Sequence, residues 1–202
     1  MKLFTSAAIV CDQTFVEHAI ALRAILETFR IRVDFYRLVQ KPQINSFFQG
    51  TPYPYTIIMC HGRGKTNDDM HLALEVVEQE QEEYDRTDGW NATTVKVTPG
   101  WIREHINNRQ GTLISTACGS GREQLANAFL QAGYAAYIAP ITTNYDANAG
   151  LIFVSNFFYF LISEDRDYAP NIYSESEAFE QSASIDPDFQ YGPGAFKRYE
   201  KT

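Results

Sequence analysis

The chain has 202 residues, which suits one domain of ordinary size. Lys and Arg total 17 against 25 Asp and Glu, and the resulting formal net charge of −8 argues against a nucleic-acid binder. Three cysteines without a C-x-x-C pair exclude a disulfide framework and a four-cysteine zinc site. The N-terminus carries no targeting pattern, and no apolar run reaches the roughly 20 residues of a membrane span. We therefore expect a cytoplasmic protein that binds neither nucleic acid nor membrane and needs no metal ion or cofactor.

Strand and helix patterns alternate along the chain. Short apolar runs predict strands buried in a mainly parallel sheet at residues 7–11, 31–39, 55–60, 112–117 and 134–141. Apolar residues at helical spacing predict helices at residues 14–30, 99–107, 123–132 and 147–162. Thr98 is expected to cap the second of these helices, and Gly133 to end the third. Residues 41–51 contain proline and glycine, which predicts a loop with a short helical turn.

The stretch over residues 68–101 allows two interpretations. Residues 69–84 have the composition of an acidic helix, but Leu72, Leu74 and Val76 alternate as in a strand. A strong strand pattern over residues 93–98 needs a partner, and Asp88-Gly89 supplies turn chemistry between the two. We favour a long hairpin, in which the acidic run over residues 75–85 is a solvated face or edge.

After residue 162 the chain becomes polar and aromatic. One helix is expected over residues 174–183, followed by a loosely held tail. The pattern predicts one α/β domain over residues 1–202, with residues 1–162 as its core and residues 163–202 as a C-terminal helix and tail.

Two predicted strands end on residues that carry chemistry. One leads into His61 and Gly62, and the other into Cys118 and Gly119. Ligands of open α/β sheets lie outside the C-terminal ends of the strands. A thiol becomes a good nucleophile when an imidazole favours its thiolate form, and a glycine N–H can hold a developing oxyanion. The glycine after Cys118 would also let a substrate backbone approach closely.

These strand ends resemble the caspase-like cysteine peptidases. Thr-Ala-Cys-Gly-Ser at residues 116–120 keeps the Ala, Cys and Gly of the caspase signature Q-A-C-[RQG]-G, with the histidine upstream, but lacks its leading Gln and closing Gly. The pattern is more similar to a CHAT-type domain, whose A-F-x-x-A-G helix end resembles Ala-Phe-Leu-Gln-Ala-Gly at residues 128–133. The resemblance covers residues 6–162.

The resemblance implies a three-layer α/β/α sandwich with a mainly parallel sheet and a hairpin insertion, and a cysteine endopeptidase that forms an acyl-enzyme. Cys118 would be the nucleophile, His61 the general base or ion-pair partner, and Gly62 the oxyanion donor. In such folds the end of the first strand and the loops after later strands line the substrate pocket, where Asp12 and Asp146 stand. Two carboxylates would favour a peptide or protein substrate with Arg or Lys before the scissile bond.

The same acidic residues and cysteines also allow purely structural interpretations. Asp12 and Asp146 are also well placed to cap the helices that follow them, and Cys118 alone fits a small buried residue. Cys11 and Cys60 lie inside apolar strands and are expected to be core residues.

Two alternatives for the function were weighed against the peptidase. Gly64-Lys65-Thr66 ends like a P-loop, but that motif needs a glycine five residues earlier, where Met59 stands. The other alternative keeps the fold and is a caspase-like interaction module, either non-catalytic or activated by a protein partner.

Overall fold

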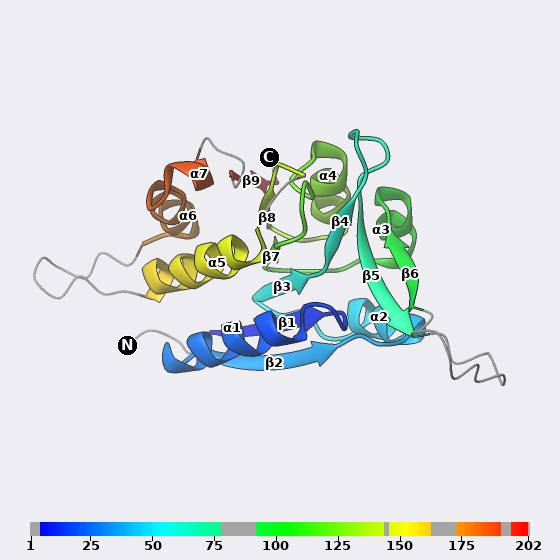
Figure 1. The fold of residues 1–202 in the computed structure, drawn as a ribbon, viewed down its shortest axis with the longest axis horizontal. Coiled ribbons are helices and arrows are strands. Elements are labelled where there is room, and N and C mark those ends of the chain that lie inside the picture. Colours follow the sequence, from blue (N-terminus) through cyan, green and yellow to red (C-terminus); the bar gives the residue numbers. More distant parts are fainter. Residues whose placement is uncertain (1–4, 78–91, 144–145, 163–172, 191–194, 202) are drawn as a thin grey trace, which may run out of the picture.

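The computed structural model describes residues 5–77, 92–143, 146–162, 173–190 and 195–201 (Figure 1). A six-stranded sheet in the order β2-β1-β3-β7-β8-β9 forms its centre. Its strands are β1 (Ser6–Cys11), β2 (Arg32–Arg37), β3 (Tyr55–Met59), β7 (Thr112–Ser115), β8 (Ala136–Pro140) and β9 (Phe196–Glu200). Neighbouring strands pair in parallel except β9, which runs antiparallel to β8. The predicted α/β class with a mainly parallel sheet is confirmed.

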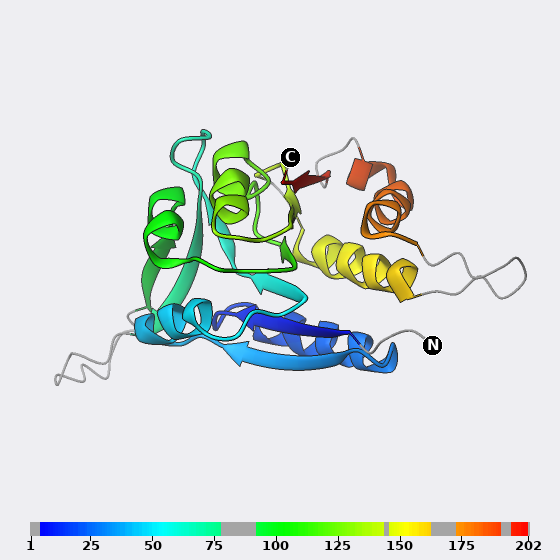
Figure 2. The ribbon, with the colours of Figure 1, turned by 180° about the vertical axis from the view of Figure 1, so that it is seen from behind.

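Helices cover both faces of this sheet (Figures 1 and 2). One layer contains α2 (Lys41–Gln49), α3 (Pro99–His105) and α4 (Glu123–Gln131), and the other contains α1 (Val16–Thr28), α5 (Ala147–Ile162), α6 (Glu175–Ser184) and α7 (Pro187–Gln190). In β1, Ala8 and Val10 join the core under the first layer, whereas Ala7 and Ile9 join the core under the second. Because successive side chains enter opposite cores, β1 is buried on both faces and is apolar at every position from Ala7 to Cys11.

A small antiparallel sheet is inserted between β3 and α3. It consists of β4 (His61–Arg63), β5 (His71–Val77) and β6 (Ala92–Val97), in that order. The alternating Leu72, Leu74 and Val76 enter the core on the α2–α3–α4 side. This confirms the hairpin and excludes the acidic helix over the described part of that stretch, while the expected turn at Asp88-Gly89 lies outside the described residues. The sequence pattern did not predict β4.

Residues 41–49 form a full helix, and the expectation of a loop there was wrong. Pro42 lies in the first turn, where its missing N–H has no helical partner to lose. The side-chain oxygen of Gln43 accepts hydrogen bonds from the backbone N–H groups of Val39 (2.8 Å) and Gln40 (3.0 Å). The proline is therefore compatible with the helix, because it lies at the second helical position. The Thr98 cap of α3 is confirmed, because its hydroxyl accepts from the N–H of Trp101 at 3.1 Å.

The C-terminal segment is more ordered than expected. The predicted helix is present as α6, which Ser174 caps, but α7 and β9 then replace the loosely held tail within residues 187–190 and 196–200. Phe196 of β9 stacks on Phe153 of α5 with ring centroids 3.7 Å apart. This contact and the pairing with β8 hold the segment against the sheet. Within the described ranges, no helix combines the length and the apolar character needed to cross a membrane.

Candidate functional site

The ends of β3 and β7 bring the His61 and Cys118 segments together at one edge of the sheet. The two strands are parallel neighbours, and the N–H of Thr116 donates to the carbonyl of Ile58 at 3.0 Å. Beyond them, Gly62 lies directly against the backbone of Cys118: a Cβ on Gly62 would stand 1.8 Å from the Cys118 carbonyl oxygen. The two segments that the sequence analysis paired are therefore in backbone contact.

The three cysteines differ in exposure. Cys11 and Cys60 are buried, which confirms their interpretation as core residues, whereas Cys118 is partly exposed. Burial, with a smaller contribution from the neighbouring Asp12 carboxylate, raises the pKa of Cys11 to about 12. Burial also raises the pKa of the Cys60 thiol well above its ordinary value. Burial thus disfavours the thiolate form of Cys11 and Cys60, whereas Cys118 is accessible to solvent in part.

His61 lies at the start of β4 with 34% of its side chain exposed. Its Nε2 atom is 3.9 Å from Oε1 of Glu75 on β5, and the ring of Phe15 meets the imidazole edge-on with centroids 5.0 Å apart. From sequence, Glu75 is expected to begin a solvated acidic run. The register explains its position, since His61 pairs with Ala73 and Glu75 lies two residues further along the same face of β5.

The turn after Cys118 is held by buried hydrogen bonds. The hydroxyl of Ser120 donates to the carbonyl of Ala117 at 2.7 Å and contacts the hydroxyl of Ser115 at 2.8 Å. The phenol of Tyr137 donates to the carbonyl of Ser120 at 3.0 Å. These bonds fix the backbone that carries Cys118, so the position of the thiol is set by the fold rather than by a free loop.

Gly119 occupies a left-handed conformation in this turn, with φ of 65°. A Cβ at this position would lie 2.9 Å from the end of the Met70 side chain and 3.0 Å from a methyl group of Thr143. The positive φ therefore favours glycine here, and a larger residue would also displace the end of the Met70 side chain. Its expected role in letting a substrate approach stays a prediction, as does the role of the Gly62 N–H as an oxyanion donor.

Asp12 is fully buried and does not present a carboxylate to a substrate, which corrects the expectation from sequence. Its two oxygens accept hydrogen bonds from the N–H groups of Thr14 (3.0 Å) and Glu75 (3.1 Å). Burial raises the pKa of Asp12, and the two N–H donors oppose part of that rise. Asp12 thus joins the turn after β1 to strand β5, and it makes no side-chain cap for α1.

Asp146 is exposed and precedes α5. Its Oδ1 accepts a hydrogen bond from the N–H of Asn148 at 3.0 Å, and its carbonyl accepts from the N–H of Gly150 at 3.4 Å. This geometry agrees with the interpretation of Asp146 as a helix-starting residue. Its exposure leaves the carboxylate accessible to a ligand as well.

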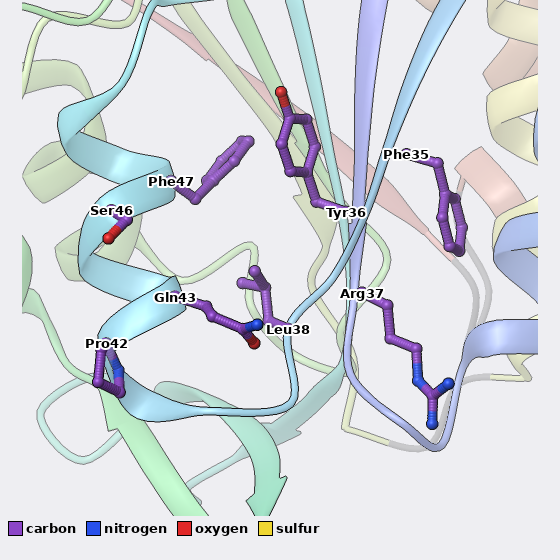
Figure 3. Close-up of a pocket in the computed structure, with 8 residues that line it drawn as sticks. All are labelled: Phe35, Tyr36, Arg37, Leu38, Pro42, Gln43, Ser46 and Phe47. Carbon is purple, nitrogen blue, oxygen red and sulfur yellow. The ribbon is translucent and has the colours of Figure 1, made fainter.

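A separate hollow of about 460 Å³ lies beside β2 (Figure 3). It is lined by Phe35, Tyr36, Arg37, Leu38, Pro42, Gln43, Ser46 and Phe47. Tyr36 projects from β2 towards Phe47 of α2, whereas Phe35 and Arg37 project to the other side of the strand (Figure 3). None of the six predicted site residues lines this hollow, and β1 lies between β2 and β3 in the sheet.

No arrangement of three or more His, Cys, Asp or Glu side chains suited to a metal ion occurs in the described part of the chain. Comparison with models of known protein families found no match, and a search of curated protein sequences found none either.

Proposed function

We propose that the protein is a caspase-like cysteine endopeptidase with a His61/Cys118 dyad. The contact between Gly62 and the backbone of Cys118 carries this proposal, because it joins the segment of a partly exposed cysteine to the histidine segment at the end of the sheet where α/β folds hold their ligands. A mostly parallel sheet between helical layers, with an antiparallel insertion after β3, also fits the caspase-like sandwich that the sequence resembles.

In this mechanism the Cys118 thiol transfers its proton to His61, and the thiolate attacks the carbonyl carbon of the scissile peptide bond. The Gly62 N–H stabilises the oxyanion that forms. Collapse of the tetrahedral intermediate breaks the C–N bond, and His61 returns the proton to the leaving amine. Water, activated by His61, then hydrolyses the thioester and restores the thiol.

The substrate preference rests on one carboxylate. Of the two acidic residues expected to select a basic side chain, Asp12 is buried and hydrogen-bonded to backbone, whereas Asp146 is exposed. We therefore propose a preference for Arg or Lys on the strength of Asp146. Faster cleavage of Asp- or Asn-containing reporter peptides than of Arg- or Lys-containing ones would contradict it.

Alkylation tests the dyad. Iodoacetamide at about pH 7, followed by peptide mass spectrometry, should modify Cys118 faster than Cys11 and Cys60, which serve as internal controls. His61→Ala should slow the modification of Cys118 roughly tenfold, since a thiol of ordinary pKa is only a few per cent ionised at this pH. The matched control is His105→Ala, because its side chain is 31% exposed, close to that of His61. Equal rates in the two histidine variants would exclude the dyad.

Peptide cleavage separates the peptidase from the interaction module. A Cys118 that depends on His61, together with cleavage of reporter peptides that Cys118→Ala abolishes, supports the enzyme. A Cys118 alkylation rate that depends on His61, without cleavage of reporter peptides, favours an enzyme that needs a protein partner. A Cys118 that is no more reactive than the buried cysteines favours the non-catalytic module.

A further inference from the structure

A hydrogen-bonded network joins the turn after β1 to strand β5 beside His61. Asp12 accepts from the backbone N–H groups of Thr14 and Glu75, and the hydroxyl of Thr14 donates to Oε2 of Glu75 at 2.8 Å. Both the backbone and the carboxylate of Glu75 are thus tied to the same turn. A side chain held at both ends loses little further rotamer freedom when it meets a neighbour.

The remaining oxygen of this carboxylate faces the histidine. Oε1 of Glu75 lies 3.9 Å from Nε2 of His61, which is longer than a hydrogen bond but within ion-pair distance. The edge of Phe15 meets the same imidazole and limits its rotation. The imidazole is therefore placed between one carboxylate and one aromatic ring.

We propose that Glu75, held by Thr14, is the positioning residue for His61. It orients the imidazole with Nε2 towards the carboxylate, which leaves Nδ1 for the thiol of Cys118. Its negative charge stabilises the protonated imidazole and so favours the imidazolium–thiolate pair. This inference rests on the proposed dyad, and it assigns a role to a residue that the sequence analysis placed in a solvated acidic run.

Titratable groups reach the His61 segment from three elements. Glu75 on β5 lies at ion-pair distance, Asp12 follows β1, and Cys118 follows β7 on the segment whose backbone contacts Gly62. Asp12 interacts with His61 through charge, but it is buried and committed to two backbone N–H groups. A variant that changes only the charge of Glu75 leaves Asp12 in place. About one third of the Glu75 side chain is exposed, so solvent screens its charge in part. We therefore expect the Glu75 carboxylate to raise the population of the imidazolium–thiolate pair by roughly two- to fivefold.

The test is the alkylation rate of Cys118 measured from about pH 5.5 to about pH 9.5. Glu75→Gln should react about two- to fivefold more slowly than wild type below about pH 7, and the two rates should converge above about pH 9, where a thiol ionises without help. Thr14→Val should act in the same direction, because it frees the Glu75 carboxylate. The matched control is Glu27→Gln, whose carboxylate is 44% exposed and pairs with Arg23 at 2.7 Å on α1.

The shape of the pH profile decides the outcome. A Glu75→Gln rate equal to wild type at every pH, with His61→Ala still slow, would overturn the role of Glu75 and leave the dyad standing. A Glu75→Gln alkylation rate that is lowered equally at every pH would also overturn the role of Glu75. Such a uniform decrease would indicate lost packing, because an effect of the Glu75 charge should disappear once the thiol ionises by itself. A His61→Ala rate equal to wild type would instead remove the dyad itself, and the role of Glu75 with it.

Discussion

Gly62 offers the sharpest test of the site, because replacing it with alanine changes one contact between two backbones. The added Cβ would lie 1.8 Å from the carbonyl oxygen of Cys118, 2.8 Å from its carbonyl carbon and 3.0 Å from its nitrogen. These are backbone atoms, so no side-chain rotation relieves the overlap. The two segments would have to separate by about 1.5 Å to reach ordinary C···O contact.

The expected cost is large but leaves a foldable protein. Overpacking of an interior typically costs about 1–3 kcal/mol, and a collision between two backbones belongs at the upper end of that range. We expect Gly62→Ala to lower the free energy of unfolding by about 3 kcal/mol, out of a total of about 5–15 kcal/mol for a domain. The separation should also weaken the dyad, because a misplacement of about 1 Å commonly reduces rates about a hundredfold.

Urea unfolding at equilibrium measures the first effect, and Cys118 alkylation with and without His61 measures the second. Gly100→Ala is the matched control: its Cβ would lie 3.7 Å from the Thr98 hydroxyl, an ordinary contact, in the first turn of α3. That variant should be unchanged or more stable by up to about 1 kcal/mol. A Gly62→Ala protein within about 0.5 kcal/mol of wild type would refute the backbone contact on which the site depends.

Two further substitutions test the surroundings of the site and the C-terminal helix. Asp12→Asn replaces one acceptor oxygen with a donor, so one of the two N–H groups that Asp12 accepts from is left unsatisfied. Urea unfolding should show a decrease of about 1–3 kcal/mol in the free energy of unfolding. The control Asp146→Asn, at an exposed position, should decrease it by less than about 0.5 kcal/mol. Because burial raises the folded-state pKa of Asp12, the carboxyl contributes stability that is fully present below its unfolded pKa of about 3.9 and is lost as the pH rises through the folded value. The free energy of unfolding of wild type should therefore rise relative to that of Asp12→Asn as the pH falls towards 4. A difference between the two proteins that does not change with pH would contradict this. Ser174→Ala removes the hydroxyl that accepts from the N–H of Glu177 at 3.3 Å and should cost about 1 kcal/mol, whereas Ser184→Ala at the far end of α6 should cost less than about 0.5 kcal/mol; equal losses would argue against the cap.

The elements that the sequence pattern predicted well are those whose side chains have one possible environment. Residues 7–11 are apolar at every position, and both faces of β1 are indeed buried. Leu72, Leu74 and Val76 alternate because one face of β5 enters the core and the other does not. Thr98 and Pro99 mark a helix start through local chemistry that needs no tertiary contact.

The elements that were missed depend on partners far away in the chain. Strand β4 has only three residues and exists through pairing with β5, and β9 is a polar strand stabilised by its pairing with β8 and by the stacking of Phe196 on Phe153. At the start of helix α2, the side chain of Gln43 accepts hydrogen bonds from two preceding backbone N–H groups. A glutamine in the sequence does not by itself indicate such a helix start. Periodicity over a short window carries no information about such contacts.

The same division runs through the candidate site. A histidine-glycine pair and a cysteine are recognisable in the amino-acid order as residues that follow two buried strands, and parallel neighbours necessarily bring their C-terminal ends to one edge. Which carboxylates lie there depends on tertiary packing. The register of β4 on β5 places Glu75 beside His61, and the turn after β1 buries Asp12. Strand ends can be predicted from local apolar runs, whereas register and burial depend on how separate segments pack. For this reason the sequence indicated Cys118 and His61 as site residues but did not indicate the Glu75 carboxylate beside the imidazole.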